Sequence, residues 1–174
     1  MTAAAPSEFS RPVALDRATV APHFREIVAT EAERAALARR LGLVALDLLS
    51  AQLSWRREAS GIICLEGELE AQVTQSCVVT LEPVAARVTD RFVRHFVQGA
   101  APADDEVVID PEADDPPEPL SDGLVDAGEI VTQQLALALD PYPRAPGSAL
   151  PAEAAQAAPA ESPFRVLAAL KTGQ

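Results

Sequence analysis

The chain has 174 residues, 48% hydrophobic and only 4% aromatic, which suffices for one domain with a core of aliphatic side chains. Its net charge of −12 argues against nucleic-acid binding over the whole surface, because phosphate contacts depend on Lys and Arg. No stretch reaches the roughly 18 apolar residues of a membrane span and the first residues do not resemble a secretory signal, so we expect a cytoplasmic protein without a membrane partner.

The first elements are a short strand and a helix. Residues from Glu8 to Leu15 are typical of a strand, and Pro12 places it at an edge because proline cannot donate to a ladder. The sequence Thr30-Glu31-Ala32-Glu33 matches a capping box, which predicts a helix start. Gly42 can adopt the left-handed backbone conformation that ends a helix, so we expect the helix to end after Leu41.

Two segments with a period of two follow. Apolar residues alternate with polar ones from Leu49 to Trp55 and again from Ile63 to Val73, with turn residues between Glu58 and Gly61. This pattern predicts an antiparallel hairpin with one buried face. The opposite face carries three carboxylates that could bind a cation but are more typical of a solvated strand: Glu66, Glu68 and Glu70.

The stretch from Val84 to Val97 fits either a strand or a helix, since its apolar residues share one side in both cases. Pro83 and the β-branched content favour a strand whose inward side chains are Val84, Ala86, Val88, Phe92 and Phe96. Basic groups on this segment are candidate contacts for RNA phosphates or a protein partner, although such groups also occur on ordinary solvated sheets: Arg87, Arg91, Arg94 and His95.

The second half alternates between low-complexity and helical sequence. From Asp104 to Asp126 there are ten acids and no Lys or Arg, and we expect residues 99–123 to form a mobile acidic insertion. Asp126 is the expected cap of a helix that ends before Pro141. We expect one α+β domain over residues 8–143, with a mostly antiparallel sheet and two or three packed helices. An Ala/Pro-rich linker over 144–161 and a short docking motif over 162–174, with an apolar face of Phe164, Leu167 and Leu170, should follow it.

The sequence lacks a phosphate-binding glycine loop, a zinc-protease HExxH and a GxSxG elbow. Cys64, Cys77, His23 and His95 do not have zinc-finger spacing, and we expect free thiols, no metal and no cofactor. Cys77 and His95 could form a nucleophile and its base. The alternative is a small buried thiol and a surface histidine.

Three segments resemble those of one known family. They are GELEAQVTQSCVVTLEP (residues 67–83), DAGEIVTQQLALALDPYP (residues 126–143) and SPFRVLAALK (residues 162–171), which together cover about a quarter of the chain. In this order and separation they resemble the YceD family. The acidic stretch between the cysteine strand and the helix resembles the family as well.

The resemblance implies a role in synthesis, processing or stability of the large-subunit (23S) ribosomal RNA, and it carries no catalytic residues. Many members have a C-x-x-C pair, but here Thr80 stands three residues after Cys77, which puts a metal or redox role of that pair in doubt. The implied partner is the large-subunit rRNA, its precursor or a large-subunit ribosomal protein. The rival hypotheses are an acidic adaptor for a basic ribosomal protein and a cysteine enzyme using Cys77.

Overall fold

A five-stranded sheet forms the centre of the computed structural model, which describes residues 7–99, 116–120 and 122–149. Along the chain, the elements are β1 (Pro12–Ala14), β2 (His23–Val28), α1 (Glu31–Arg40), β3 (Ala45–Arg57), β4 (Ile63–Ser76), β5 (Pro83–Gln98), β6 (Glu118–Leu120), β7 (Leu124–Asp126) and α2 (Ala127–Ala138). The main sheet has the order β2-β3-β4-β5-β6, and β1 pairs with β7 in a small second sheet.

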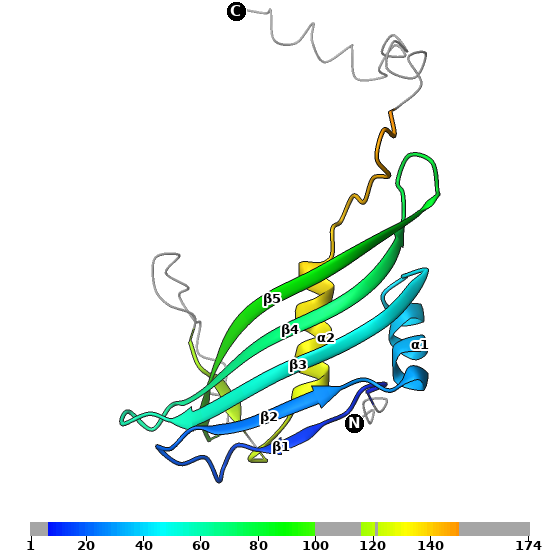
Figure 1. The fold of residues 1–174 in the computed structure, drawn as a ribbon. Coiled ribbons are helices and arrows are strands. Elements are labelled where there is room, and N and C mark those ends of the chain that lie inside the picture. The colour runs from blue at the N-terminus through cyan, green and yellow to red at the C-terminus, as the bar shows by residue number, and fades with distance from the viewer. Residues whose placement is uncertain (1–6, 100–115, 121, 150–174) are drawn as a thin grey trace, which may run out of the picture.

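All pairings in the main sheet are antiparallel except the short parallel contact between β5 and β6. Figure 1 shows α2 crossing one face of this sheet, and α1 beside the end where β2 stops and β3 begins. The α+β fold class with a mostly antiparallel sheet and helices near Thr30 and Asp126 is therefore confirmed.

Alternation along β3 and β4 explains why one face of the sheet is covered. Leu49, Leu53, Leu65 and Leu69 are at most 2% exposed and belong to one core cluster with residues of both helices. Burying each such leucine contributes about 1.5–3 kcal/mol. The predicted hairpin between β3 and β4 is confirmed, with its turn between Arg57 and Ile63.

The ambiguous stretch after Pro83 is a strand, as favoured. Phe92 and Phe96 are buried, but Ala86, predicted to point inward, is exposed. Among the described residues β5 meets β6 only from Phe96 onward, so most of β5 is an edge strand with less cover. Near the middle of β4, Gly67 leaves room for the Phe92 ring, whose Cζ would lie 2.2 Å from an added Cβ.

The capping box at the start of α1 is confirmed. The Thr30 hydroxyl accepts a hydrogen bond from the Glu33 amide, and the Glu33 carboxylate accepts one from the Thr30 amide at 2.7 Å. After α1, Gly42 adopts a φ of +66°, the left-handed conformation that the sequence predicted there.

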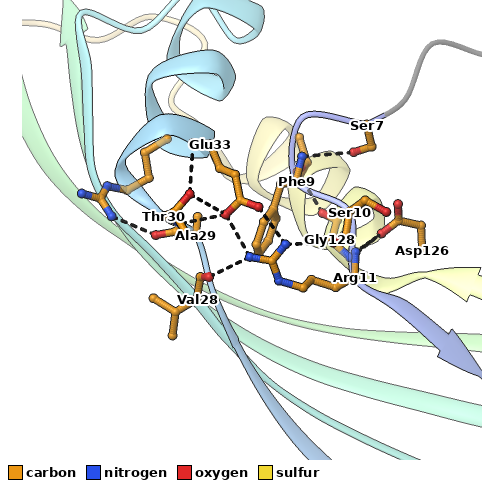
Figure 2. A network of polar contacts seen from close by, with 12 residues as sticks. Ser7, Phe9, Ser10, Arg11, Val28, Ala29, Thr30, Glu33, Asp126 and Gly128 are labelled. Carbon is orange, nitrogen blue, oxygen red and sulfur yellow. Dashed lines mark hydrogen bonds and ion pairs between the residues drawn. The ribbon is translucent and has the colours of Figure 1, made fainter.

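A polar network ties the N-terminal segment to both helices (Figure 2). The Arg11 guanidinium donates to both carboxylate oxygens of Glu33, at 2.7 and 2.9 Å, and its amide donates to the Asp126 carboxylate at 2.7 Å. Asp126 also caps α2 by accepting from the amides of Gly128 and Glu129. The two helices are thereby linked through a segment more than a hundred residues from α2 in sequence.

Three sequence-based expectations need correction. The N-terminal strand is shorter than predicted, because only Pro12–Ala14 pairs with β7. Residues 118–120, inside the expected mobile insertion, form β6, since Leu120 is buried in the core at 4% exposure. His23–Val28 forms β2, which was not predicted. The remainder of the insertion, residues 100–115 and 121, and the chain beyond residue 149 lie outside the described residues.

Candidate functional site

The face of the sheet opposite the helices is not covered by the described elements. We call it the open face, and define it as every second residue of four strands: Phe24 to Val28, Ser50 to Arg56, Cys64 to Gln72 and Arg87 to His95. Antiparallel register places these side chains in rows across the strands. The three carboxylates predicted to face solvent, Glu66, Glu68 and Glu70, lie along β4, between β3 and β5.

Each arginine on the open face meets a glutamate. Arg56 pairs with Glu66 at 3.1 Å, Arg91 with Glu68 at 3.1 Å and Arg87 with Glu70 at 2.9 Å. The Arg91 and Arg87 side chains remain 80% and 66% exposed, so each pair contributes about 0–1 kcal/mol and exchanges readily with other partners. Arginine and glutamate side chains thus alternate across the open face.

The four predicted contact residues of β5 do not share one face. Arg87, Arg91 and His95 lie on the open face, as expected from their odd positions. Arg94 lies on the opposite side of the strand and donates to Glu118 of β6 at 2.5 Å. Strand parity separates Arg94 from the other three, because neighbouring side chains of a strand point to opposite faces.

A shallow hollow of about 380 Å³ lies over the middle of the open face. Phe24 of β2 and Val93 of β5, which are 77% and 56% exposed, line it together with polar residues including Gln52, Glu68 and Arg91. Exposed apolar side chains beside charged groups are typical of a surface that binds a partner. The β2 side of this surface was missed in the sequence, because Phe24 stands outside any recognisable motif.

Cys77 is fully buried at the end of β4, where the chain turns into β5. Its Sγ accepts hydrogen bonds from the amides of Val79 and Thr80, both at 3.4 Å, and from Ala145 at 3.3 Å. These donors, first that of Ala145, lower the pKa of the Cys77 thiol to about 6. The residue that replaces the second family cysteine, Thr80, thus contributes its backbone amide to the remaining one.

The hypothesis that His95 activates Cys77 is wrong. His95 pairs across the strands with Cys64, whereas Cys77 follows Ser76, which pairs with Pro83 at the other end of the hairpin. About a dozen residues of strand, on the order of 40 Å, separate the two ends. His23 also lies at the His95 end, stacked on Trp55. The same separation excludes a disulfide between Cys64 and Cys77 in this fold.

The turn after Cys77 is held by the segment that follows α2. The Val78 amide donates to Pro143 O at 2.9 Å, and the Gln75 side chain donates to Asp140 O at 2.9 Å. Leu81 at this turn adopts a φ of +63° and is 78% exposed, an unusual conformation for a branched residue. The segment around Cys77 and the segment from Asp140 to Pro143 therefore form one structural unit.

The D-x-G-E sequence of residues 126–129 has a structural role. Besides the cap supplied by Asp126, Gly128 admits the Phe9 carbonyl, whose oxygen would lie 1.9 Å from an added Cβ. Glu129 accepts from Arg40 at 2.6 and 2.8 Å and from Ser7 at 2.8 Å, and the Arg40 guanidinium lowers its pKa to about 2. These residues fix α2 against α1 and the N-terminal segment.

The docking motif predicted from Phe164, Leu167 and Leu170 lies outside the described residues, and so does most of the predicted linker. In the part of the chain with described coordinates, no helix is long and apolar enough to cross a membrane.

A sequence model of one protein family, described as large ribosomal RNA subunit accumulation protein YceD, matches residues 65–171. The match spans β5, β6, β7, α2 and all but the first two residues of β4, and it covers more than half of the chain. No curated protein and no solved structure matches the chain.

Proposed function

The chain belongs to the YceD family of large ribosomal RNA subunit accumulation proteins, and we therefore propose that it is a non-enzymatic factor in the synthesis, processing or stability of the large-subunit ribosomal RNA. The family match over residues 65–171 carries this proposal. The complete burial of Cys77 and its separation from both histidines support a binding role, because a substrate must be able to reach a nucleophilic thiol.

Depletion of the protein tests this role. We expect the ratio of large-subunit to small-subunit rRNA to fall, with restoration by a plasmid-borne wild-type copy. Northern analysis of precursors would identify the affected step. An unchanged ratio after complete depletion would exclude the function.

A Cys77→Ala strain separates the binding role from cysteine catalysis. Because we assign no chemistry to the thiol, rRNA accumulation should stay within twofold of wild type, once protein levels are matched by immunoblot. A loss as severe as that of the deletion, at normal protein level, would support the cysteine enzyme instead.

The charge pattern favours a basic ribosomal protein over bare RNA as the direct partner. Arg56, Arg87 and Arg91 are matched by Glu66, Glu70 and Glu68, so these groups give the open face no net positive charge that would attract RNA phosphates. The ten acids from Asp104 to Asp126 would repel RNA and attract a cationic protein. We propose that the protein acts as an adaptor whose acidic groups engage a basic large-subunit protein.

Affinity capture from lysate with and without RNase distinguishes the two partners. The adaptor predicts that one large-subunit protein stays bound after nuclease treatment and is released by salt, which screens exposed charges. Loss of all ribosomal proteins upon nuclease treatment would show that RNA is the direct ligand.

The role of the open-face arginines is tested by Arg87→Glu with Arg91→Glu. The matched control is Arg17→Glu with Arg39→Glu, which reverses two exposed charges elsewhere. If these arginines contact RNA, the first variant loses RNA affinity and has a shallower salt slope. For a protein adaptor we expect both variants to bind RNA as weakly as wild type.

A further inference from the structure

Three side chains with metal-binding atoms meet where β3 turns into β4. The Cys64 sulfur, a ring nitrogen of His95 and a carboxylate oxygen of Glu58 all lie within 4.8 Å of one another. They come from three separate segments, since Glu58 follows β3, Cys64 is the second residue of β4 and His95 lies in β5.

The backbone fixes this arrangement. Cys64 and His95 are directly opposite in the β4–β5 register, and both point to the open face. Glu58 is held in the turn, where its amide donates to Ile62 O at 2.8 Å and its carbonyl accepts from Gly61 at 3.0 Å. Cross-strand pairs keep their side chains close, so the donor atoms remain near one another while the sheet is intact.

We propose that Glu58, Cys64 and His95 form a binding site for a divalent transition-metal ion of the zinc class. A thiolate, an imidazole and a carboxylate are the three ligand types that zinc takes from proteins, whereas Mg²⁺ and Ca²⁺ prefer oxygen alone. The site goes beyond the proposed role in rRNA accumulation and does not depend on it.

The spacing suits such an ion after a small adjustment. Tetrahedral zinc with its usual bond lengths places S, N and O ligands roughly 3.3–3.6 Å from one another. Cys64 is 3% exposed and held within the sheet, while His95 is exposed. Rotation about the side-chain bonds of His95 and Glu58 that brings the ligand atoms about one ångström closer together would close the site.

The surrounding charges favour a cation as well. The Arg56 guanidinium, opposite Cys64 in the register, is bound to Glu66 at 3.1 Å. The same Glu66 oxygen lies 3.7 Å from the Cys64 sulfur, where it accepts from the thiol. Glu66 thus neutralises Arg56. A bound cation would replace the thiol proton of Cys64, and with it this hydrogen bond, and the Glu66 carboxylate then adds negative charge beside the ion.

Three protein ligands leave the fourth tetrahedral position to water. We therefore expect an exchangeable site, in contrast to closed four-ligand structural sites. Cys77 cannot contribute, because it lies at the other end of the β4–β5 hairpin.

Cobalt and zinc titration of the reduced full-length protein tests the site. We expect Co²⁺ to produce the near-ultraviolet thiolate charge-transfer absorption, and Zn²⁺ to displace it. Cys77→Ser is the matched control, since it removes the other thiol and should keep the absorption. Cys64→Ser should abolish it.

His95→Ala, which changes an exposed side chain, provides a second variant should Cys64→Ser not fold by circular dichroism. We expect it to weaken Zn²⁺ binding at least tenfold, because loss of even an outer partner of a metal ligand costs about 10–100-fold. Absence of the absorption in wild type, or equal Zn²⁺ affinity in wild type and His95→Ala, would overturn the proposal.

Discussion

At the scale of single residues, Gly128 is the described glycine at which an added Cβ would come closest to another atom. An added Cβ would lie 1.9 Å from the Phe9 carbonyl oxygen, and a backbone atom cannot turn aside as a side chain can. The glycine is therefore required for the close approach of the N-terminal segment to α2.

We expect Gly128→Ala to lower the free energy of unfolding by about 1–3 kcal/mol through overpacking. Gly67→Ala should cost less, because the clashing group there is the end of the Phe92 ring, which can rotate away. Urea denaturation of both variants and of the exposed control Gln133→Ala measures this. An equal or larger loss for Gly67→Ala would contradict the ranking.

The lowered pKa of Glu129 implies that the stability of the fold depends on pH. Its pKa is lowered from 4.5 to about 2 by the hydrogen bond from Arg40, so its ionised form stabilises the folded state above pH 4.5. That contribution is lost as the pH falls towards about 2, where the carboxylate is protonated. Glu33, held by Arg11, behaves in the same direction.

We expect Glu129→Gln to cost about 1–2 kcal/mol at neutral pH and progressively less as the solution becomes more acidic. Thermal melts across this acidic range, compared with the exposed control Glu26→Gln, measure the difference. A cost that does not change with pH would mean that the Arg40 contact contributes nothing through charge.

At the scale of elements, periodicity located the β3–β4 hairpin and both helices because each buries one face. Thr30 and Asp126 mark helix starts through local hydrogen bonds, which sequence shows directly. β2 and β6 were not predicted, because each has few buried residues and these are buried by segments that are distant in the sequence. Of the candidate site, the sequence predicted the basic residues of β5. It did not predict their glutamate partners or the contact between Cys64 and His95, because both depend on the register of the strands.

The turn between β4 and β5 contains a strained residue. We expect Leu81→Gly to raise the free energy of unfolding by about 0.5–1 kcal/mol, because glycine adopts the left-handed conformation without a Cβ clash. Leu81→Ala, which keeps the strain and removes the exposed side chain, should leave stability nearly unchanged. Chemical denaturation measures both, and a destabilised Leu81→Gly would show that the leucine side chain itself holds the turn.

At the scale of the whole molecule, the core extends beyond the region that matches the family. Phe9, Leu15 and Leu37, all N-terminal to residue 65, are completely buried in the same cluster as Val131 and Leu135. The matched region also depends on β3, which pairs with β4 along nearly its whole length.

We therefore expect a fragment of residues 65–174 to remain unfolded, whereas a fragment of residues 7–149, which keeps every described element, should melt cooperatively. Loss of β3 would expose β4 as a long unpaired edge, and loss of Phe9 would open a cavity beside α2. A cooperative transition in the 65–174 fragment would show that the N-terminal third is dispensable for folding.

The bond between the Arg11 amide and the Asp126 carboxylate joins positions 115 apart in the chain. During translation, the segment around Arg11 consequently cannot form this bond until Asp126 has been synthesised. Until α2 leaves the ribosome, the nascent chain exposes Phe9 and Leu15 and is open to chaperones and proteases.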